Sequence, residues 1–321
     1  MDEIKQLISK ELRDFEFKFA DAVKSHVPLL DRIMHYIVKR KGKQIRPMFV
    51  ILSAKLFAPT IEEGTYRAAA LVELLHTATL VHDDVVDDAY ERRGFFSINA
   101  LWKNKIAVLV GDYLLSKGLL LSLNNKDFRT LQILAEAVKE MSEGELLQIE
   151  KTRKLDIKED IYFEIIRRKT ASLLAAACAA GAWSVTGNDD TTQLMQKFGE
   201  KVGIAFQIKD DLFDYGTANV GKPTGIDIRE KKMTLPLIYT LQHAPVDTRK
   251  RIINIVKNHN TDKDKVAEVI DIVQKSGGIQ YAKEKMIQYR DEALEILHQF
   301  PANDIRNGLE TLVRYTTDRT F

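Results

Sequence analysis

The chain contains two matching clusters of aspartates. One consists of Asp83, Asp84 and Asp87, and the other of Asp210, Asp211 and Asp214, so each places carboxylates at positions i, i+1 and i+4. On a helix, residues i and i+4 lie one turn apart on the same face, where like charges repel. Carboxylate oxygens suit Mg²⁺, which keeps several waters and is commonly shared with substrate phosphates. The pattern therefore predicts two helical metal sites, which would hold a diphosphate between them if they face each other.

The apolar segment that ends in the first cluster favours a metal site over a solvated helix end. Asp83 and Asp87 continue a helical face that passes back through Thr79 and His76. At the C-terminal end of a helix the macrodipole is negative and disfavours carboxylates. A bound cation would offset this effect. Either Asp87 or its neighbour Asp88 could be the outer ligand, and the spacing favours Asp87.

Two basic turns suggest diphosphate binding. Arg92 and Arg93 follow the first cluster, and guanidinium groups bind phosphate in a bidentate geometry. The other turn contains Gly42, Lys43 and Arg46 and precedes a predicted helix, whose first N–H groups bind anions. Beside an acidic cluster, we interpret these turns as anion sites rather than as solvated surface.

Polar residues also surround the second cluster. Gln207 lies on the same helical face as Asp210, and it is either a hydrogen-bond partner in the core or a carbonyl dipole aimed at a developing cation. Lys169 and Thr170 open a helix of small residues and offer a similar pairing of a phosphate ligand and a dipole. Two further cations, Lys222 and Lys232, follow the cluster. We interpret them as cations over the second metal site.

The bulk composition is that of an ordinary globular protein. The chain has 321 residues, of which 45% are hydrophobic and 29% charged, and a net charge of +2 gives no reason to expect nucleic acid as a partner. The single Cys178 excludes an internal disulfide. The N-terminus is polar, and no uninterrupted apolar run approaches the ~18–20 residues of a membrane span. We expect a cytoplasmic protein that touches a membrane surface only through a greasy substrate or product.

Hydrophobic residues recur at three- and four-residue steps along almost the whole chain, which predicts helices. Strand-like alternation is nearly absent. We therefore predict an all-α fold, a single domain over residues 1–321, built as a bundle of about ten or more helices around a central cavity. Small residues dominate 171–185 and either pack a core or line a tunnel. The expected helices are 66–90, 105–123, 127–150, 159–186, 191–216, 233–243, 247–257, 263–275 and 279–299.

Taken together, these segments resemble the trans-type isoprenyl (polyprenyl) diphosphate synthases. Any one of them is weak evidence, but their order along the chain is specific to that family. The sequence around the first cluster most resembles octaprenyl diphosphate synthase and its long-chain relatives. The matching segments are 42–47, 75–87, 92–94, 111–114, 144–145, 169–170, 206–214, 221–227 and 232–236.

The resemblance implies a homodimer that condenses isopentenyl diphosphate with an allylic diphosphate, using about three Mg²⁺ ions per active site, with Mn²⁺ as a substitute. By position, it assigns Mg²⁺ binding to Asp83 and Asp87 with support from Asp84, and to Asp210 with Asp211 and Asp214 around it. It assigns the allylic diphosphate to Arg92, Lys169, Lys222 and Lys232. It assigns isopentenyl diphosphate to Lys43, Arg46, His76 and Arg93, with Gly42 in the same turn. Thr170 and Gln207 would face the allylic carbocation.

Two small residues suggest a long product. Ala78 and Thr79 precede Asp83 by five and four positions, which puts Thr79 about 6 Å along the helix axis. In the family, a large aromatic at this level blocks elongation. We therefore predict a product of about seven to nine isoprene units, with octaprenyl favoured and farnesyl diphosphate as the starter, for a quinone or another lipid. A geranylgeranyl diphosphate synthase is the alternative, and the tunnel floor could lie at 115–121 or 131–134.

Three other classes of protein fit the sequence less well. A terpene cyclase normally mixes Asn, Ser or Thr and Glu into its second metal motif and lacks the paired basic turns. An HD-type metal phosphohydrolase, suggested by His82 and Asp83, needs further ligand histidines and leaves the second cluster unexplained. A non-catalytic partner subunit would be expected to have lost a cluster or a basic turn. The sequence favours the synthase, and leaves open whether Arg314 or Arg319 reaches the site.

Overall fold

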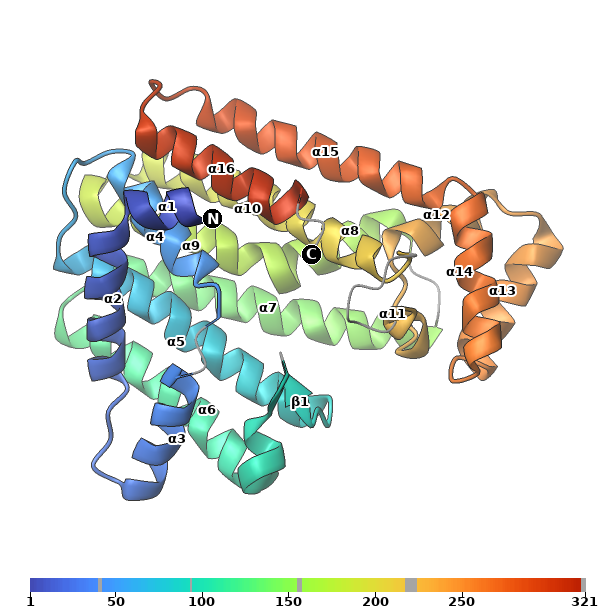
Figure 1. Cartoon of the computed structure of the whole chain (residues 1–321), viewed down its shortest axis with the longest axis horizontal. Coiled ribbons are helices and arrows are strands. Elements are labelled where there is room, and N and C mark those ends of the chain that lie inside the picture. The colour runs from blue at the N-terminus through green and yellow to red at the C-terminus, as the bar shows by residue number, and fades with distance from the viewer. Residues whose placement is uncertain (40–41, 93, 155–157, 217–223, 319–321) are drawn as a thin grey trace. The chain divides into compact units, whose positions relative to one another are not determined.

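The computed structural model consists almost wholly of helices, and it describes residues 1–39, 42–92, 94–154, 158–216 and 224–318 (Figure 1). This confirms the predicted all-α fold. The only strands in these ranges are the short pair β1 (Glu91–Arg92) and β2 (Phe95–Phe96), which pair antiparallel. The helices are α1 (Asp2–Leu7), α2 (Ser9–Ala22), α3 (Pro28–Lys39), α4 (Ile45–Lys55), α5 (Glu63–Val86), α6 (Ile98–Asn124), α7 (Phe128–Lys154), α8 (Glu159–Ile166), the π-helical turn η1 (Arg167–Ala171), α9 (Ser172–Thr186), α10 (Asp189–Phe213), α11 (Ile226–Arg229), α12 (Leu235–His243), α13 (Val246–Asn258), α14 (Lys263–Lys275), α15 (Gly278–Leu297) and α16 (Asp304–Asp318).

The chain forms two compact units. The first unit comprises Met1–Val138, Leu173–Gln196 and Pro301–Leu309, and the second comprises Lys139–Ser172, Lys197–Phe300 and Glu310–Phe321. The single domain expected over residues 1–321 stays a prediction. The first acidic cluster belongs to the first unit and the second cluster to the second unit.

The first unit is built around α4, α5 and α6. Every residue of α4 from Met48 to Ala54 is buried, and α5 is apolar over most of its circumference. Figure 1 shows α5 and α6 lying side by side. Gly111 of α6 permits this close approach, because a β carbon there would lie 2.1 Å from Nε2 of His82 on α5. The packing holds the acidic end of α5 in place.

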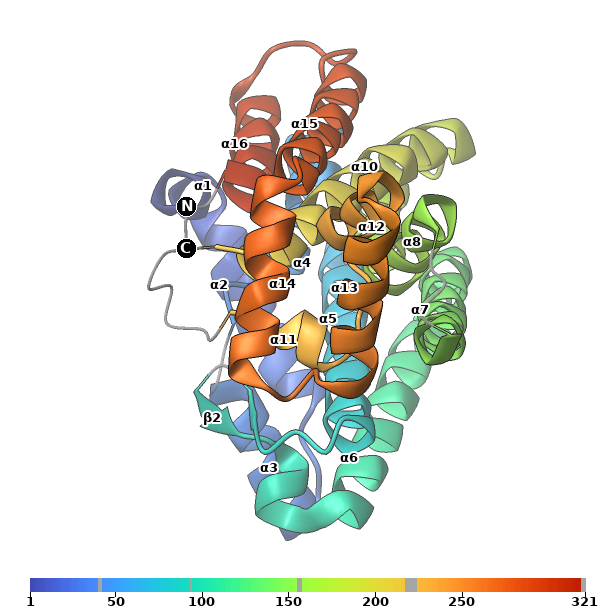
Figure 2. The ribbon, with the colours of Figure 1, turned by 90° about the vertical axis from the view of Figure 1, so that its right-hand side faces the viewer.

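The second unit has its own hydrophobic core. Side chains from α8, α10, α12, α13, α14 and α15 meet in it, with Ile208, Leu237 and Val269 fully buried. Figure 2 shows α13 and α14 side by side in this unit. Ile208 lies on α10 just before the second acidic cluster, so this core anchors the helix that carries the cluster.

Several predicted helix bounds were wrong: the helix expected over 66–90 ends at Val86 as α5, and the one expected over 105–123 begins at Ile98 as α6. The single helix expected over 159–186 is divided by η1, because periodicity does not distinguish an α-helical turn from a π-helical one. No helix was expected between residues 216 and 233, but the short helix α11 lies there. No helix was expected between residues 90 and 105, and β1 and β2 form a hairpin there, in which Gly94 takes φ 76°, a left-handed conformation that favours glycine. Such local choices depend on contacts that the sequence pattern does not show.

Among the described helices, α6 alone is long and apolar enough to cross a membrane by length and composition. Its most apolar window of 18 residues has a mean hydropathy of 1.7, although charged residues such as Lys105 and Asp112 interrupt the apolar run of the helix. One face of α6 is buried against α5, through residues such as Val110 and Leu114. The opposite face exposes several leucines.

Candidate active site

A cavity of about 330 Å³ opens in the first unit beside α5. Aromatic side chains of α2, α3 and β2 form much of its wall, and polar groups of α5 and of the turn before α4 complete it. The residues of the sequence prediction that line it are Gly42, His76 and Asp84. The cavity therefore joins the first basic turn to the acidic end of α5.

Arg46 and His76 lie in direct contact, as the predicted binding site for isopentenyl diphosphate requires. Nη1 of Arg46 is 2.8 Å from Nε2 of His76, and the histidine ring is buried. A guanidinium can only donate, so this hydrogen bond requires Nε2 of His76 to accept and places the ring proton on Nδ1. Lys43 lies exposed in the preceding turn. The pair presents fixed positive charge beside the cavity.

The three aspartates of the first cluster differ in burial. Asp84 is 4% exposed and lines the cavity, Asp83 is half-buried, and Asp87 is exposed at the C-cap of α5. Asp88 lies beyond the helix, with φ 48°. The residue that caps the end of α5 is Asp87, which the spacing favours over Asp88 as the outer metal ligand.

The described residues contain no group of three or more His, Cys, Asp or Glu side chains that could hold a metal ion. The structure therefore does not show a ready-made cage of side chains. An isolated pair of carboxylates on one helix face suits Mg²⁺ instead, because that ion retains water and binds substrate phosphates as its remaining ligands. The donor chemistry of both clusters fits such an ion.

Some predicted cations lie outside the described residues. Arg93 and Lys222 lie outside the described residues. Of Arg92 only the backbone is described, in β1. Their roles stay predictions. Of the cations predicted near the second cluster, the structure describes Lys169 and Lys232.

In the second cluster, Asp211 is buried and held by two side chains. Tyr162 donates its hydroxyl hydrogen bond to Oδ2 of Asp211 at 2.7 Å, and Nε2 of Gln207 donates to Oδ1 at 2.8 Å. Burial, with the neighbouring charge of Asp227, raises the pKa of Asp211 to about 8, and the two hydrogen bonds only partly offset this. Burial likewise raises the pKa of Tyr162 well above its usual value, so its hydroxyl stays protonated.

Asp214 organises the chain that follows the cluster. Its two carboxylate oxygens accept hydrogen bonds from the backbone N–H groups of Ile226, at 2.8 Å, and Asp227, at 3.1 Å. These N–H groups belong to the first residues of α11, which have no carbonyl partner within the helix, so Asp214 provides their hydrogen-bond acceptors. Asp210 is half-buried, whereas Asp214 is 9% exposed. Within the second cluster, Asp210 is therefore the most accessible carboxylate for a metal ion.

Lys169 and Thr170 lie in the π-helical turn η1. Lys169 forms an ion pair with Glu145 of α7, and the hydroxyl of Thr170 donates to Oε1 of Gln207 at 2.8 Å. Two glycines allow this arrangement: β carbons at Gly144 and Gly203 would lie 2.8 Å from Cβ of Arg168 and 2.5 Å from Cα of Ala171. π-Helical turns are frequent at functional sites. The structure thus brings Lys169, Thr170 and Gln207 together.

Lys232 approaches the acidic groups around α11. Its ammonium forms an ion pair with Glu230 at 2.5 Å, and its charge lowers the pKa of Asp227. Burial outweighs this effect, so the pKa of Asp227 is raised to about 6. Sequence reasoning gave Asp227 no role of its own.

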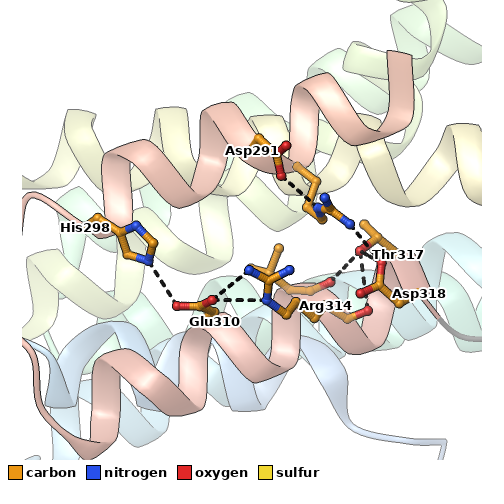
Figure 3. Close-up of polar contacts among 8 residues, drawn as sticks. Asp291, His298, Glu310, Arg314, Thr317 and Asp318 are labelled. Carbon is orange, nitrogen blue, oxygen red and sulfur yellow. Dashed lines mark hydrogen bonds and ion pairs between the residues drawn. The ribbon is translucent and has the colours of Figure 1, made fainter. Parts of the chain in front are cut away.

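The C-terminal helix holds Arg314 in a polar network. In Figure 3, Glu310 of α16 faces His298 and Arg314. Nε2 of His298 lies 2.9 Å from the carboxylate of Glu310, and Nε and Nη2 of Arg314 donate to it at 3.0 and 2.9 Å. These partners hold the pKa of Glu310 below its usual value. Arg314 is thus bound to Glu310 in a polar network of the second unit. Arg319 lies outside the described residues.

The two residues predicted to set chain length are small and well packed. Ala78 is fully buried in α5, and Thr79 is half-buried with its hydroxyl donating to the carbonyl oxygen of His76 at 2.9 Å. The floor of the tunnel stays a prediction. In the candidate floor on α6, Leu119 and Leu120 are exposed.

Comparison with known proteins identifies the family of the chain. Residues 27–273 match the family model described as polyprenyl synthetase. The chain belongs to the polyprenyl synthetase family. It is a prenyltransferase, a trans-prenyl diphosphate synthase, as the sequence favoured.

Relatives in the polyprenyl synthetase family match along nearly the full chain. An all-trans-nonaprenyl-diphosphate synthase (geranyl-diphosphate specific) of Rhodobacter capsulatus is 36% identical over 93% of this chain and 92% of its own length. A geranylgeranyl diphosphate synthase of Saccharolobus solfataricus is 30% identical over 99% and 98%. A crystal structure of a polyprenyl synthase from Caulobacter crescentus, complexed with calcium and isoprenyl diphosphate, aligns with a TM-score of 0.91 and 32% identity over 99% and 97%.

Sequence reasoning missed Tyr162, the partner of Asp211. Tyr162 lies about two helical turns before Lys169 in an apolar stretch, where a single tyrosine is typical of an ordinary core residue. Only the fold reveals that its hydroxyl meets a carboxylate of the second cluster. No signal in one sequence would have found it.

Proposed function

We propose that this polyprenyl synthetase makes a long-chain product, extending farnesyl diphosphate with isopentenyl diphosphate to about seven to nine isoprene units, with octaprenyl favoured. The small residues Ala78 and Thr79 below Asp83 carry this proposal. Relatives named as hepta-, octa- and nonaprenyl synthases support it. The geranylgeranyl diphosphate synthases among the relatives keep a four-unit product as the alternative.

In this proposal, Asp83 and Asp87 of the first cluster and Asp210 of the second hold Mg²⁺; the similar synthase complexed with calcium and isoprenyl diphosphate supports a divalent cation. Bound Mg²⁺ supplies charge that stabilises the leaving diphosphate. Asp84 supports the first pair from its buried position. The number of ions, about three per active site, belongs to the proposal.

The cations of the chain bind the two diphosphates. Arg46, oriented by His76, and Lys43 bind isopentenyl diphosphate, and Lys169 and Lys232 bind the allylic diphosphate through charge-assisted hydrogen bonds. The predicted contributions of Arg92, Arg93 and Lys222 are part of the same proposal. With the diphosphates fixed, the carbons that will bond are held close, which removes the entropy cost of bringing them together.

Prenyl transfer then breaks the allylic C–O bond, whose electrons leave with the diphosphate. The double bond of isopentenyl diphosphate attacks the allylic carbon, and the adduct loses a proton to the released diphosphate, which forms the new double bond. Thr170 and Gln207 place oxygen dipoles toward the developing positive charge, a form of electrostatic stabilisation. Apolar walls exclude water, which would otherwise capture the cation.

One assay tests the proposed product. The purified chain is incubated with Mg²⁺, labelled isopentenyl diphosphate and farnesyl diphosphate, and the products are separated by chromatography. We expect products of about seven to nine units. A product no longer than four units would contradict the long-chain proposal and favour the alternative. Activity of the chain alone also shows that it needs no partner subunit.

We further propose a homodimer that uses the exposed face of α6. Six large apolar side chains lie 42–56% exposed on this helix, namely Leu101, Val108, Leu109, Leu119, Leu120 and Leu123. Contiguous exposed apolar surface of this kind marks an interaction site. A single helix face suits a second copy of the chain, because a two-fold axis brings the same patch together on both copies.

We also propose that residues 1–321 fold as one domain and that the protein is cytoplasmic. The chain passes between the two units at residues 138, 172, 196, 300 and 309, so neither unit is a continuous segment. The lipid product would draw the protein to a membrane surface. A single cooperative unfolding transition, seen by both circular dichroism and calorimetry, would support one domain.

A further inference from the structure

A line of four hydrogen-bonded side chains joins α8, α10 and η1 in the second unit. Tyr162 of α8 donates to Oδ2 of Asp211, Nε2 of Gln207 donates to Oδ1 of the same carboxylate, and Thr170 donates to Oε1 of Gln207. The three distances are 2.7, 2.8 and 2.8 Å. The line starts in the core and ends at the two residues expected to face the allylic carbon.

This line fixes which way the Gln207 amide points. Nε2 of Gln207 donates to Oδ1 of Asp211, and an ionised Asp211 accepts but does not donate, so in that state it requires the NH₂ group of Gln207 on its side. The hydroxyl of Thr170 meets the opposite end of the amide, which must then be the carbonyl oxygen. A carbonyl oxygen has two lone pairs, and a hydroxyl donor occupies one. The carbonyl dipole of Gln207 is thus set by its partners rather than by its own rotamer.

Tyr162 holds the carboxylate that sets this orientation. Tyr162 is 3% and Asp211 6% exposed, so water does not replace a lost partner readily. The torsion that turns a carboxyl group has a broad minimum, and one hydrogen bond to Gln207 does not lock it. Without the hydroxyl of Tyr162, Oδ2 would be left unsatisfied, and the carboxylate would rotate away from its geometry with Gln207.

We propose that Tyr162 is a positioning residue for prenyl transfer, which through Asp211 holds the carbonyl oxygen of Gln207 toward the reacting allylic carbon. The inference rests on the proposed function of the second unit. Tyr162 touches neither substrate nor metal in this role. Its effect belongs to the transition state, because the carbonyl dipole interacts most strongly once positive charge develops.

The test compares two tyrosines that each donate to a carboxylate near α8. Tyr162→Phe removes only the hydroxyl that meets Asp211. Tyr281→Phe is the matched control, because its hydroxyl donates to Glu159 of the same helix at 2.6 Å and is not part of the line to Gln207. If Tyr162 merely anchored α8, the two variants would lose activity equally. All variants are assayed at a temperature at which circular dichroism shows them folded.

We measure kcat and KM for condensation with allylic diphosphates of two, three and four isoprene units. We expect Tyr162→Phe to lower kcat about ten-fold with KM changed less than about two-fold, because lost orientation acts in the transition state. Tyr281→Phe should stay within about two-fold of the wild-type kcat. An unchanged kcat in Tyr162→Phe, or equal losses in both variants, would overturn the inference.

A double-mutant cycle then asks whether Tyr162 acts through Gln207. Gln207→Met removes the amide, so adding Tyr162→Phe to it should cause no further loss of kcat. Losses that multiply would show that Tyr162 acts by another route and would overturn the inference. A wild-type chain that condenses none of the three starters would overturn the proposed function, and this inference with it. An active wild type with an unaffected Tyr162→Phe variant overturns the inference alone.

Discussion

The carboxylates of the two clusters share a spacing but differ in their surroundings. Asp87 is exposed at the end of α5, whereas Asp211 and Asp214 are buried and occupied by protein donors. The shared spacing predicted a metal site at each cluster but not which carboxylates are accessible. Burial and hydrogen-bond partners are set by the tertiary fold, and one sequence does not display them. The accessible carboxylates are therefore the better candidates for metal binding.

Asp83 and Asp88 provide a direct test of the first cluster. Asp83→Asn should lower kcat for condensation about a thousand-fold, because the amide is a poor ligand for a hard cation and stabilisation of the leaving group is lost. Asp88 lies past the end of α5 with φ 48°, so Asp88→Asn should stay within about two-fold of wild type. Incorporation of labelled isopentenyl diphosphate measures both. Equal losses would place Asp88 among the ligands.

Thr79 tests the chain-length proposal. Thr79→Phe should shorten the product, because a ring about 6 Å along the helix from Asp83 would obstruct the growing chain. Thr79→Ser is the control, because it changes the same position of α5 without adding bulk, so the product length should stay that of wild type. Chromatography of the products gives the lengths. Unchanged length in Thr79→Phe would show that the chain does not pass this level.

The raised pKa of Asp211 predicts a pH-dependent stability. Its pKa is about 8 in the folded protein against an ordinary value of 3.8, so between these values the folded state binds a proton that the unfolded chain does not. The free energy of unfolding should therefore fall as pH rises from 5 to 8, by up to about 1.4 kcal/mol per pH unit from this group.

Urea unfolding in EDTA at several pH values measures this effect. Asp211→Asn removes the titrating group and should flatten the fall in stability. Asp160→Asn, at an exposed position on the neighbouring helix α8, should leave the slope unchanged. Parallel slopes for wild type and Asp211→Asn would contradict the assignment of the raised pKa to Asp211.

At the scale of elements, hydrophobic periodicity predicted most helices because each buries a continuous apolar stripe. The predictions of 263–275 and 247–257 lie within one residue of α14 and α13 at each end. The π-helical turn η1 was not predicted, because it depends on α7 and α10 approaching through Gly144 and Gly203. The turn that carries Lys169 and Thr170 is thus a product of packing between elements.

Close helix packing in the first unit yields an element-scale prediction. Gly181 of α9 faces α4, and a β carbon there would lie 2.3 Å from the carbonyl oxygen of Val50. Backbone cannot yield as a flexible side chain does, so Gly181→Ala should lower the free energy of unfolding by about 1–3 kcal/mol. A β carbon at Gly64 of α5 would lie 3.8 Å from its nearest neighbour, Nη2 of Arg67. Gly64→Ala should therefore raise the free energy of unfolding by about 0.5–1 kcal/mol, because alanine favours the helix. Urea unfolding measures both, and equal effects would contradict the proposed contact.

At the scale of the whole molecule, composition and motif order sufficed to predict an all-α synthase, but they did not reveal the division of the chain into two units. Each unit draws on separated segments, and separation along a sequence leaves no mark in local patterns. The apolar face of α6 also escaped the sequence prediction, because the helix reads as uniformly hydrophobic. Only burial by α5 distinguishes the packed side from the exposed one.

The exposed side of α6 makes the oligomeric state testable. A charge placed within an apolar interface would be desolvated without a partner, so Leu120→Glu should convert a dimer to a monomer. Leu146→Glu is the matched control, because Leu146 on α7 is 67% exposed and lies outside the α6 face. Light scattering after size-exclusion chromatography gives the mass of each variant against the 36.6 kDa of one chain. A dimeric Leu120→Glu would exclude this face of α6 as the interface, and a monomeric wild type would exclude the dimer itself.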